Sequence, residues 1–132
     1  MHDNLFDKIN IPEDNINFLN GNAADLEAEC KNYEEKIKKA GGIDIQLLGI
    51  GSNGHIAFNE PADCFQRWSH VVTLKESTVK DNSRFFKSIE EVPTQAVTMG
   101  IGSIMQAKKI LIIALGEHKA LSLIHISEPT RP

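Results

Sequence analysis

An apolar run that passes directly into a glycine-rich loop is the feature that most restricts how this chain can fold. Residues 43–48, with the sequence Ile-Asp-Ile-Gln-Leu-Leu, have the length and apolar content of a buried strand. The loop that follows contains three glycines: Gly49, Gly51 and Gly54. Its second half carries His55 and Glu60 and ends at Pro61. Because open α/β sheets place ligand sites in the loops after their strands, we expect this segment to line a functional site.

The segments around this loop alternate between helix and strand patterns. A helix is expected from an N-cap at Asn22 to a stop at Gly41, with one apolar stripe that consists of Leu26, Cys30, Tyr33 and Ile37. Further strands are expected at 71–74, 95–99 and 109–115, and further helices at 76–86 and 103–107. This alternation predicts an α/β protein whose parallel sheet is covered by helices on both faces.

Length, charge and cysteine content exclude several classes of function. The chain has 132 residues, enough for one domain, and a net charge of −4 without a basic patch, so no nucleic-acid partner is expected. No apolar run approaches the ~18 residues of a membrane span, so no membrane partner is expected. Cys30 and Cys64 lack the spacing of a metal site, and Cys30 on the apolar stripe predicts a buried free thiol. Reduced cysteines favour a cytoplasmic location.

The glycine spacing also matches the dinucleotide-binding pattern G-x-G-x-x-G, with Glu76 placed as a ribose ligand. That pattern requires a helix that starts after the third glycine and holds the pyrophosphate at its N-terminus. Pro61 would fall inside this helix, where a proline costs about 3 kcal/mol. A nicotinamide-binding domain is therefore the weaker interpretation of the loop.

The stronger interpretation is acid–base chemistry. His55 lies between Asn53 and Glu60, and a carboxylate bonded to one ring nitrogen fixes the tautomer and raises the basicity of the other. A structural histidine is the alternative. Two cations, Arg84 and Lys119, are also expected near this edge of the sheet, where they could bind an anionic small molecule. The alternative for Arg84 is a surface charge on a helix whose neighbours, Phe85 and Phe86, enter the core.

Several of these segments resemble the glucosamine-6-phosphate deaminase family, also called glucosamine-6-phosphate isomerases. The most specific is residues 53–61, Asn-Gly-His-Ile-Ala-Phe-Asn-Glu-Pro. Residues 15–22, 33–37, 82–86 and 115–120 match in the same order, so the resemblance runs from about Met1 to Ala120. It implies a Rossmann-like fold, a parallel-sheet sandwich, and the conversion of D-glucosamine 6-phosphate and water to D-fructose 6-phosphate and ammonia in N-acetylglucosamine catabolism. It implies no organic cofactor and no metal.

The resemblance also assigns roles to individual residues. His55 would take the proton of the anomeric hydroxyl and pass a proton to the ring oxygen, Glu60 would orient His55, and Asn53 would complete the catalytic set. Gly51 and Gly54 would shape the active-site loop. Arg84 and Lys119 would bind the 6-phosphate of the sugar. The sequence does not set the oligomeric state, and a homo-oligomer is one expectation for the full-length protein.

Two parts of the family pattern do not occur in these 132 residues. One is an aspartate base in an Asp-Glu-Tyr-type segment, and the other is a Gly/Thr-rich phosphate loop. Residues 1–120 are therefore interpreted as part of a domain that is incomplete at both ends. This part is expected to be inactive alone. Residues 121–132 resemble a translated sequencing adapter and are interpreted as a non-native tail. The alternatives are a non-catalytic sugar-phosphate-binding regulator and a 6-phosphogluconolactonase-like hydrolase.

Overall fold

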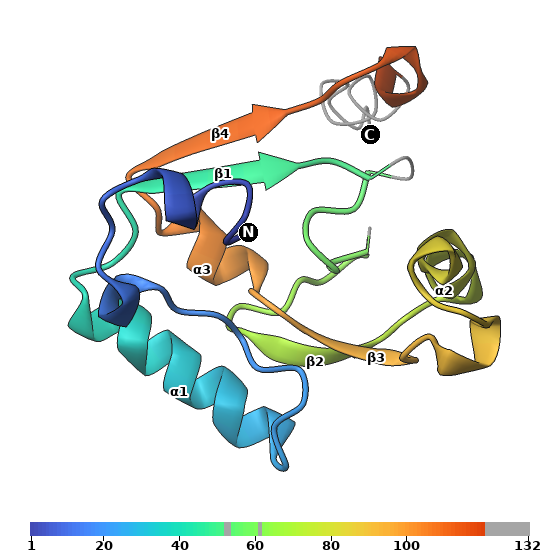
Figure 1. Ribbon diagram of the computed structural model, residues 1–132, viewed down its shortest axis with the longest axis horizontal. Coiled ribbons are helices and arrows are strands. Elements are labelled where there is room, and N and C mark those ends of the chain that lie inside the picture. Colours follow the sequence, from blue (N-terminus) through green and yellow to red (C-terminus); the bar gives the residue numbers. More distant parts are fainter. Residues whose placement is uncertain (52–53, 61, 121–132) are drawn as a thin grey trace.

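The structure, a computed structural model, describes residues 1–51, 54–60 and 62–120. Within these ranges the strands form two separate pairs (Figure 1). Strands β1 (Ile45–Gly49) and β4 (Lys109–Ile113) are parallel, and strands β2 (His70–Thr73) and β3 (Gln95–Thr98) are antiparallel. The helices are α1 (Leu26–Lys39), α2 (Glu76–Asn82) and α3 (Ile101–Met105). The α/β class is confirmed, but the antiparallel β2–β3 pair differs from the purely parallel sheet that was expected.

Helix α1 begins three residues later than its predicted cap would place it. Its N-cap is Asp25, whose side chain accepts a 2.9 Å hydrogen bond from the Ala28 N–H, so the prediction of Asn22 as the cap was wrong. Both are good capping residues, but only Asp25 directly precedes the apolar stripe. The predicted stop is confirmed: Gly41 and Gly42 have positive φ angles of 88° and 93°, which favour glycine.

Helix α1 packs on the β2–β3 pair through its apolar stripe. Cys30 is buried there as a free cysteine, as predicted, and burial together with the neighbouring glutamates raises the pKa of its thiol. One carboxylate oxygen of Glu34 accepts hydrogen bonds from the Ser69 N–H at 2.7 Å, the Ser69 hydroxyl at 2.5 Å and the Ser103 hydroxyl at 2.6 Å. Glu34 therefore joins α1 to the chain before β2 and to α3.

Helix α3 lies directly against the backbone that precedes β2. The Ile101 N–H donates to the Gln66 carbonyl at 3.0 Å, and the Ser103 N–H donates to the Arg67 carbonyl at 2.9 Å. A Cβ atom built on Gly100 or Gly102 would overlap the backbone of Arg67. These two positions must be glycine because the two backbones approach so closely.

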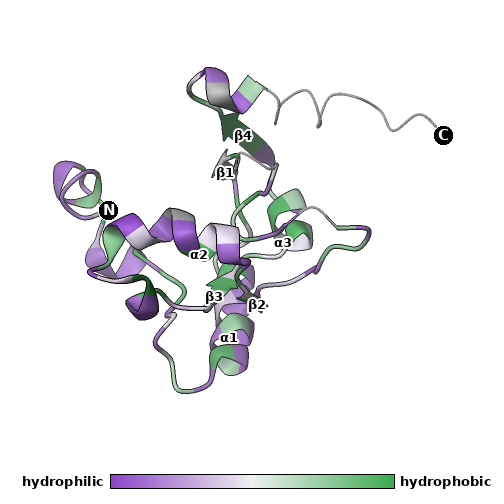
Figure 2. Ribbon diagram, turned by 90° about the vertical axis from the view of Figure 1, so that its right-hand side faces the viewer, coloured by the Kyte–Doolittle hydropathy of each residue, from purple (hydrophilic) through white to green (hydrophobic). Residues whose placement is uncertain are grey.

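The β1–β4 pair carries much of the exposed apolar surface of the described chain. Residues Leu47 and Leu111 each leave more than half of their surface exposed, and Figure 2 shows β4 as a strongly hydrophobic ribbon at the edge of the molecule. The expectation that helices cover both faces of the parallel strands is therefore not met by residues 1–51, 54–60 and 62–120. Leu48 and Ile50 are buried, so the end of β1 nearest the glycine loop is the better packed end.

Candidate active site

A cleft of about 410 Å³ lies where β1 and β4 end. One wall is the glycine loop after β1, which contributes Gly51 and His55. Another is helix α2 with the 3-10 turn that follows it, Ser83–Phe85, which contributes Thr78 and Arg84. Lys119 completes it from a 3-10 turn after β4, Glu117–Lys119. The cleft thus occupies the carboxyl edge of the parallel strands, where the sequence placed the site.

Two glycines of the loop, Gly51 and Gly54, lie close to His55. The Gly51 N–H donates to the His55 carbonyl at 2.8 Å, and the Gly54 N–H donates to the Gly51 carbonyl at 3.1 Å. Gly54 has a φ of +86°, a backbone conformation that residues other than glycine rarely adopt. A Cβ atom on Gly51 would overlap the imidazole of His55. The absence of that atom lets the ring lie against the backbone at the cleft.

A second turn follows at once and anchors the loop to β3. Ile56 and Asn59 exchange backbone hydrogen bonds of 3.2 and 3.0 Å across Ala57 and Phe58, and Ala57 has a positive φ of 53°. The buried Asn59 donates from its side chain to the Met99 carbonyl at 2.8 Å. Residues 54–60 therefore form a turn in place of the helix that a dinucleotide fingerprint needs, which argues against the nicotinamide interpretation.

Glu60 lies beside the cleft, held by the start of α2. One carboxylate oxygen accepts from the Thr78 hydroxyl at 3.3 Å, and the other pairs with the Lys75 ammonium at 3.4 Å. Thr78 itself lines the cleft. Asn53, the third predicted member of the catalytic set, lies outside the described residues.

The two predicted cations line the same cleft as His55. Arg84 and Lys119 come from different segments, and the structure brings both to this cavity. The Arg84 guanidinium lies 4.8 Å from the ring centre of Phe85, which is 70% exposed. The alternative for Arg84 required Phe85 and Phe86 to enter the core, but both are exposed in this chain. The position of Arg84 and Lys119 in the cleft fits a phosphate-binding pair, and this role stays a prediction.

Thr78 and Asn82 are cleft residues that the sequence analysis missed. The Asn82 side chain donates to the Thr78 carbonyl at 2.8 Å, one helical turn earlier. Their spacing of one turn on a predicted helix, just before Arg84, was the available signal. Among residues 1–51, 54–60 and 62–120, no group of three His, Cys, Asp or Glu side chains could hold a metal ion.

Parallel strands with a cleft at their carboxyl edge, a histidine on a glycine loop and two cations in the cleft lining define an α/β protein with the layout of a small-molecule binding site. The chain belongs to the family described as glucosamine-6-phosphate isomerases/6-phosphogluconolactonase, whose family model matches residues 1–132. The resemblance seen in the sequence is thereby confirmed.

Relatives at high identity are named glucosamine-6-phosphate deaminase. The protein of Thermoanaerobacter sp. (strain X514) is 59% identical over 120 residues, which cover 91% of this chain and 47% of the relative. That of Lachnoclostridium phytofermentans is 60% identical over 119 residues, with 90% and 50% covered. The chain thus spans about half the length of the curated relatives that it matches.

A solved structure supports the same fold. It is that of a monomeric glucosamine-6-phosphate deaminase, which matches 96% of this chain with a TM-score of 0.89 at 48% identity. This chain covers 52% of that protein. In the part of the chain that the structure describes, no helix is long and apolar enough to cross a membrane.

Proposed function

We propose that this chain forms the central part of a glucosamine-6-phosphate deaminase, which converts D-glucosamine 6-phosphate and water to D-fructose 6-phosphate and ammonia. The observation that carries the proposal is the single cleft that gathers His55, Arg84 and Lys119 from three separate segments. A histidine that can exchange protons and two cations in the same cleft suit a phosphorylated substrate that must undergo proton transfer. The names of the relatives support the same reaction.

His55 has the task of opening the sugar ring. Its imidazole accepts the proton of the anomeric hydroxyl and returns a proton to the ring oxygen as the bond between that oxygen and carbon 1 breaks. Glu60 orients the imidazole and stabilises it while it carries the extra proton, and Asn53 completes the set. The later proton shift between carbons 1 and 2 needs a base, which we assign to an aspartate outside these 132 residues.

Arg84 and Lys119 bind the 6-phosphate and so fix the distance between the phosphate and the anomeric carbon. Arginine offers planar paired donors, and lysine offers a compact charge, so the two can contact different phosphate oxygens. Charge-assisted hydrogen bonds contribute about 1.5–3 kcal/mol each. The phosphate thus supplies the binding energy that holds carbon 1 against His55.

The test needs the segments that this chain lacks relative to its relatives. Residues 1–120 would replace the aligned 120 residues of the Thermoanaerobacter deaminase, and ammonia release from glucosamine 6-phosphate would be measured. We expect turnover that falls by about a hundredfold or more in His55→Gln. His70→Gln is the matched control, because His70 lies in β2 and outside the cleft lining.

The same chimera separates the alternatives. A chimera that hydrolyses 6-phosphogluconolactone but releases no ammonia from glucosamine 6-phosphate would favour a 6-phosphogluconolactonase, the second activity that the family includes. Tight sugar-phosphate binding without turnover would favour a regulator. Residues 1–132 alone are expected to release no ammonia, because the proposed aspartate base is missing. Activity of that polypeptide above its His55→Gln variant would refute the proposed mechanism.

Two further expectations belong to this proposal. The free cysteines, one of them buried, support a reducing and hence cytoplasmic location. A homo-oligomer of the complete protein stays an expectation, since the solved relative is described as monomeric. Light scattering on the chimera would decide between the two states.

A further inference from the structure

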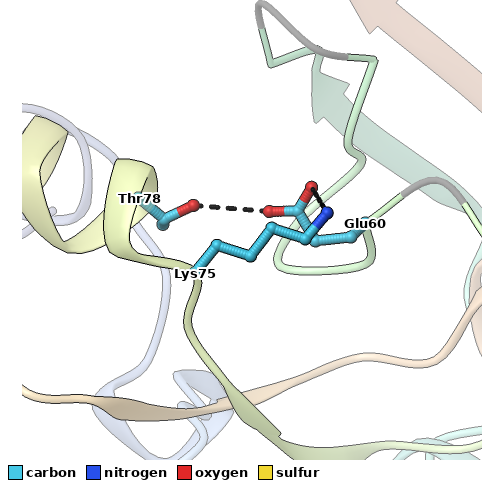
Figure 3. A network of polar contacts seen from close by, with 3 residues as sticks. All are labelled: Glu60, Lys75 and Thr78. Carbon is cyan, nitrogen blue, oxygen red and sulfur yellow. Dashed lines mark hydrogen bonds and ion pairs between the residues drawn. The ribbon is translucent and has the colours of Figure 1, made fainter.

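The carboxylate of Glu60 is held at both oxygens, by Thr78 in the first turn of α2 and by Lys75 just before it (Figure 3). Thr78 donates its hydroxyl proton to one oxygen at 3.3 Å, and the Lys75 ammonium faces the other at 3.4 Å. We propose that Thr78 and Lys75 are positioning residues that set the orientation of Glu60 toward the acid–base histidine. This inference rests on the proposed function and extends it to two residues that the sequence analysis did not single out.

The environment of the two contacts gives them unequal weight. Thr78 is 9% exposed, so its hydroxyl has little access to water and its bond to Glu60 is difficult to replace. A threonine side chain also has few χ1 rotamers, which keeps the hydroxyl in place. The side chain of Lys75 is 59% exposed and that of Glu60 20%, so this ion pair is screened and weaker. Thr78 is therefore the principal positioning residue.

Two fixed oxygens define the plane of the carboxylate. A carboxylate bonded at one oxygen alone can rotate about its last side-chain torsion, which has a broad energy profile. The second contact removes this freedom. Small errors in the orientation of a group in an acid–base set lower the rate of the proton-transfer step, so they are expected mainly in kcat.

Helix α2 also leads into the phosphate end of the cleft. It ends at Asn82, which bonds back to the Thr78 carbonyl at 2.8 Å, and Arg84 follows in the next turn. Helix α2 thus contacts the carboxylate through Thr78, and the turn directly after it carries a predicted phosphate ligand. A displacement of α2 would move both groups, whereas a change confined to the Thr78 hydroxyl would affect only Glu60.

The kinetic test uses the chimera that retains residues 1–120. Thr78→Val keeps the shape of the side chain and removes the donor, and we expect kcat to fall about three- to tenfold with KM changed less than about twofold. Thr78→Ser, which restores the hydroxyl, should recover most of kcat. Lys75→Gln should lower kcat about twofold. Thr73→Val and Lys80→Gln are matched controls at exposed positions, expected to leave both constants unchanged.

A double-mutant cycle separates positioning from general packing. In a Glu60→Ala background the Thr78→Val change should have no further effect on kcat, since the group that it positions is gone. Additive losses in the two variants would overturn the proposal. So would a Thr78→Val variant that raises KM and leaves kcat intact.

A second measurement does not depend on turnover. The carboxyl-carbon NMR resonance of Glu60 should shift in Thr78→Val and return in Thr78→Ser, because the hydrogen bond polarises that carbon. An unchanged resonance in Thr78→Val would overturn the positioning role even in an inactive chimera. Loss of ammonia release in the parent chimera would instead count against the proposed function alone.

Discussion

A single methyl group on Gly51 should disable the site without unfolding the protein. In Gly51→Ala the new Cβ would overlap three atoms of the His55 ring, well inside the 3.0 Å separation that real Cβ atoms keep. The φ of Gly51 is not in the left-handed region, so the backbone can accept alanine. The ring, as the end of a side chain, must move by roughly 1 Å, and a shift of that size in an acid–base group costs about a hundredfold in rate.

The neighbouring glycine provides a matched control for this prediction. Gly49 lines the same cleft, yet a Cβ at Gly49 meets nothing within 4 Å. We expect Gly51→Ala in the chimera to lower kcat by about a hundredfold while its thermal midpoint, followed by circular dichroism, changes by less than about 4 °C. Gly49→Ala should keep both values. The reasoning would be refuted by a Gly51→Ala enzyme within threefold of the parent, or by an equal loss in Gly49→Ala.

Three further predictions concern the rest of the structure. Arg84→Ala and Lys119→Ala should each weaken glucosamine 6-phosphate binding by about tenfold or more but leave the binding of unphosphorylated glucosamine unchanged in calorimetric titrations; equal losses for both sugars would exclude a phosphate role. Gly100→Ala should lower the unfolding free energy by about 2–4 kcal/mol in denaturant titrations, because its Cβ meets backbone, whereas Gly21→Ala, where the space is open, should change it little. At pH ~8 the buried Cys30, whose thiol pKa is raised by burial, should resist thiol reagents in the folded protein and react as fast as an exposed cysteine after unfolding, as peptide mapping would show.

The parts of the fold that the sequence predicted are those with a local cause. The apolar stripe and the glycine stop specify α1, and the run at 109–115 specifies β4, because spacing and turn residues act within a few positions. The pairing of β2 with β3 was not predictable in this way. Its antiparallel direction depends on how the chain between Thr73 and Gln95 returns, which no short pattern encodes.

The site shows the same division between local and distant causes. His55 could be predicted because it lies on the glycine loop. Arg84 and Lys119 could be predicted because each is a cation expected near the same edge of the sheet. Thr78 was missed because a threonine in a short helix forms no distinctive sequence pattern. Its proposed role depends on a hydrogen bond to Glu60, 18 positions earlier in the chain. Gly100 was missed for a similar reason: the backbone that it accommodates belongs to Arg67 and Trp68.

The parallel pairing of β1 with β4 also bears on how the cleft assembles during folding. The ion pair between Lys108 and Asp44, at the start of this pair, closes a loop of 64 positions. Contacts across so long a loop form slowly, because the chain loses closure entropy before any contact compensates for it. The cleft, whose histidine and lysine lie just beyond the two strands, should therefore form late. An anion held between them would tie the carboxyl ends of β1 and β4 together and slow the separation of the two strands.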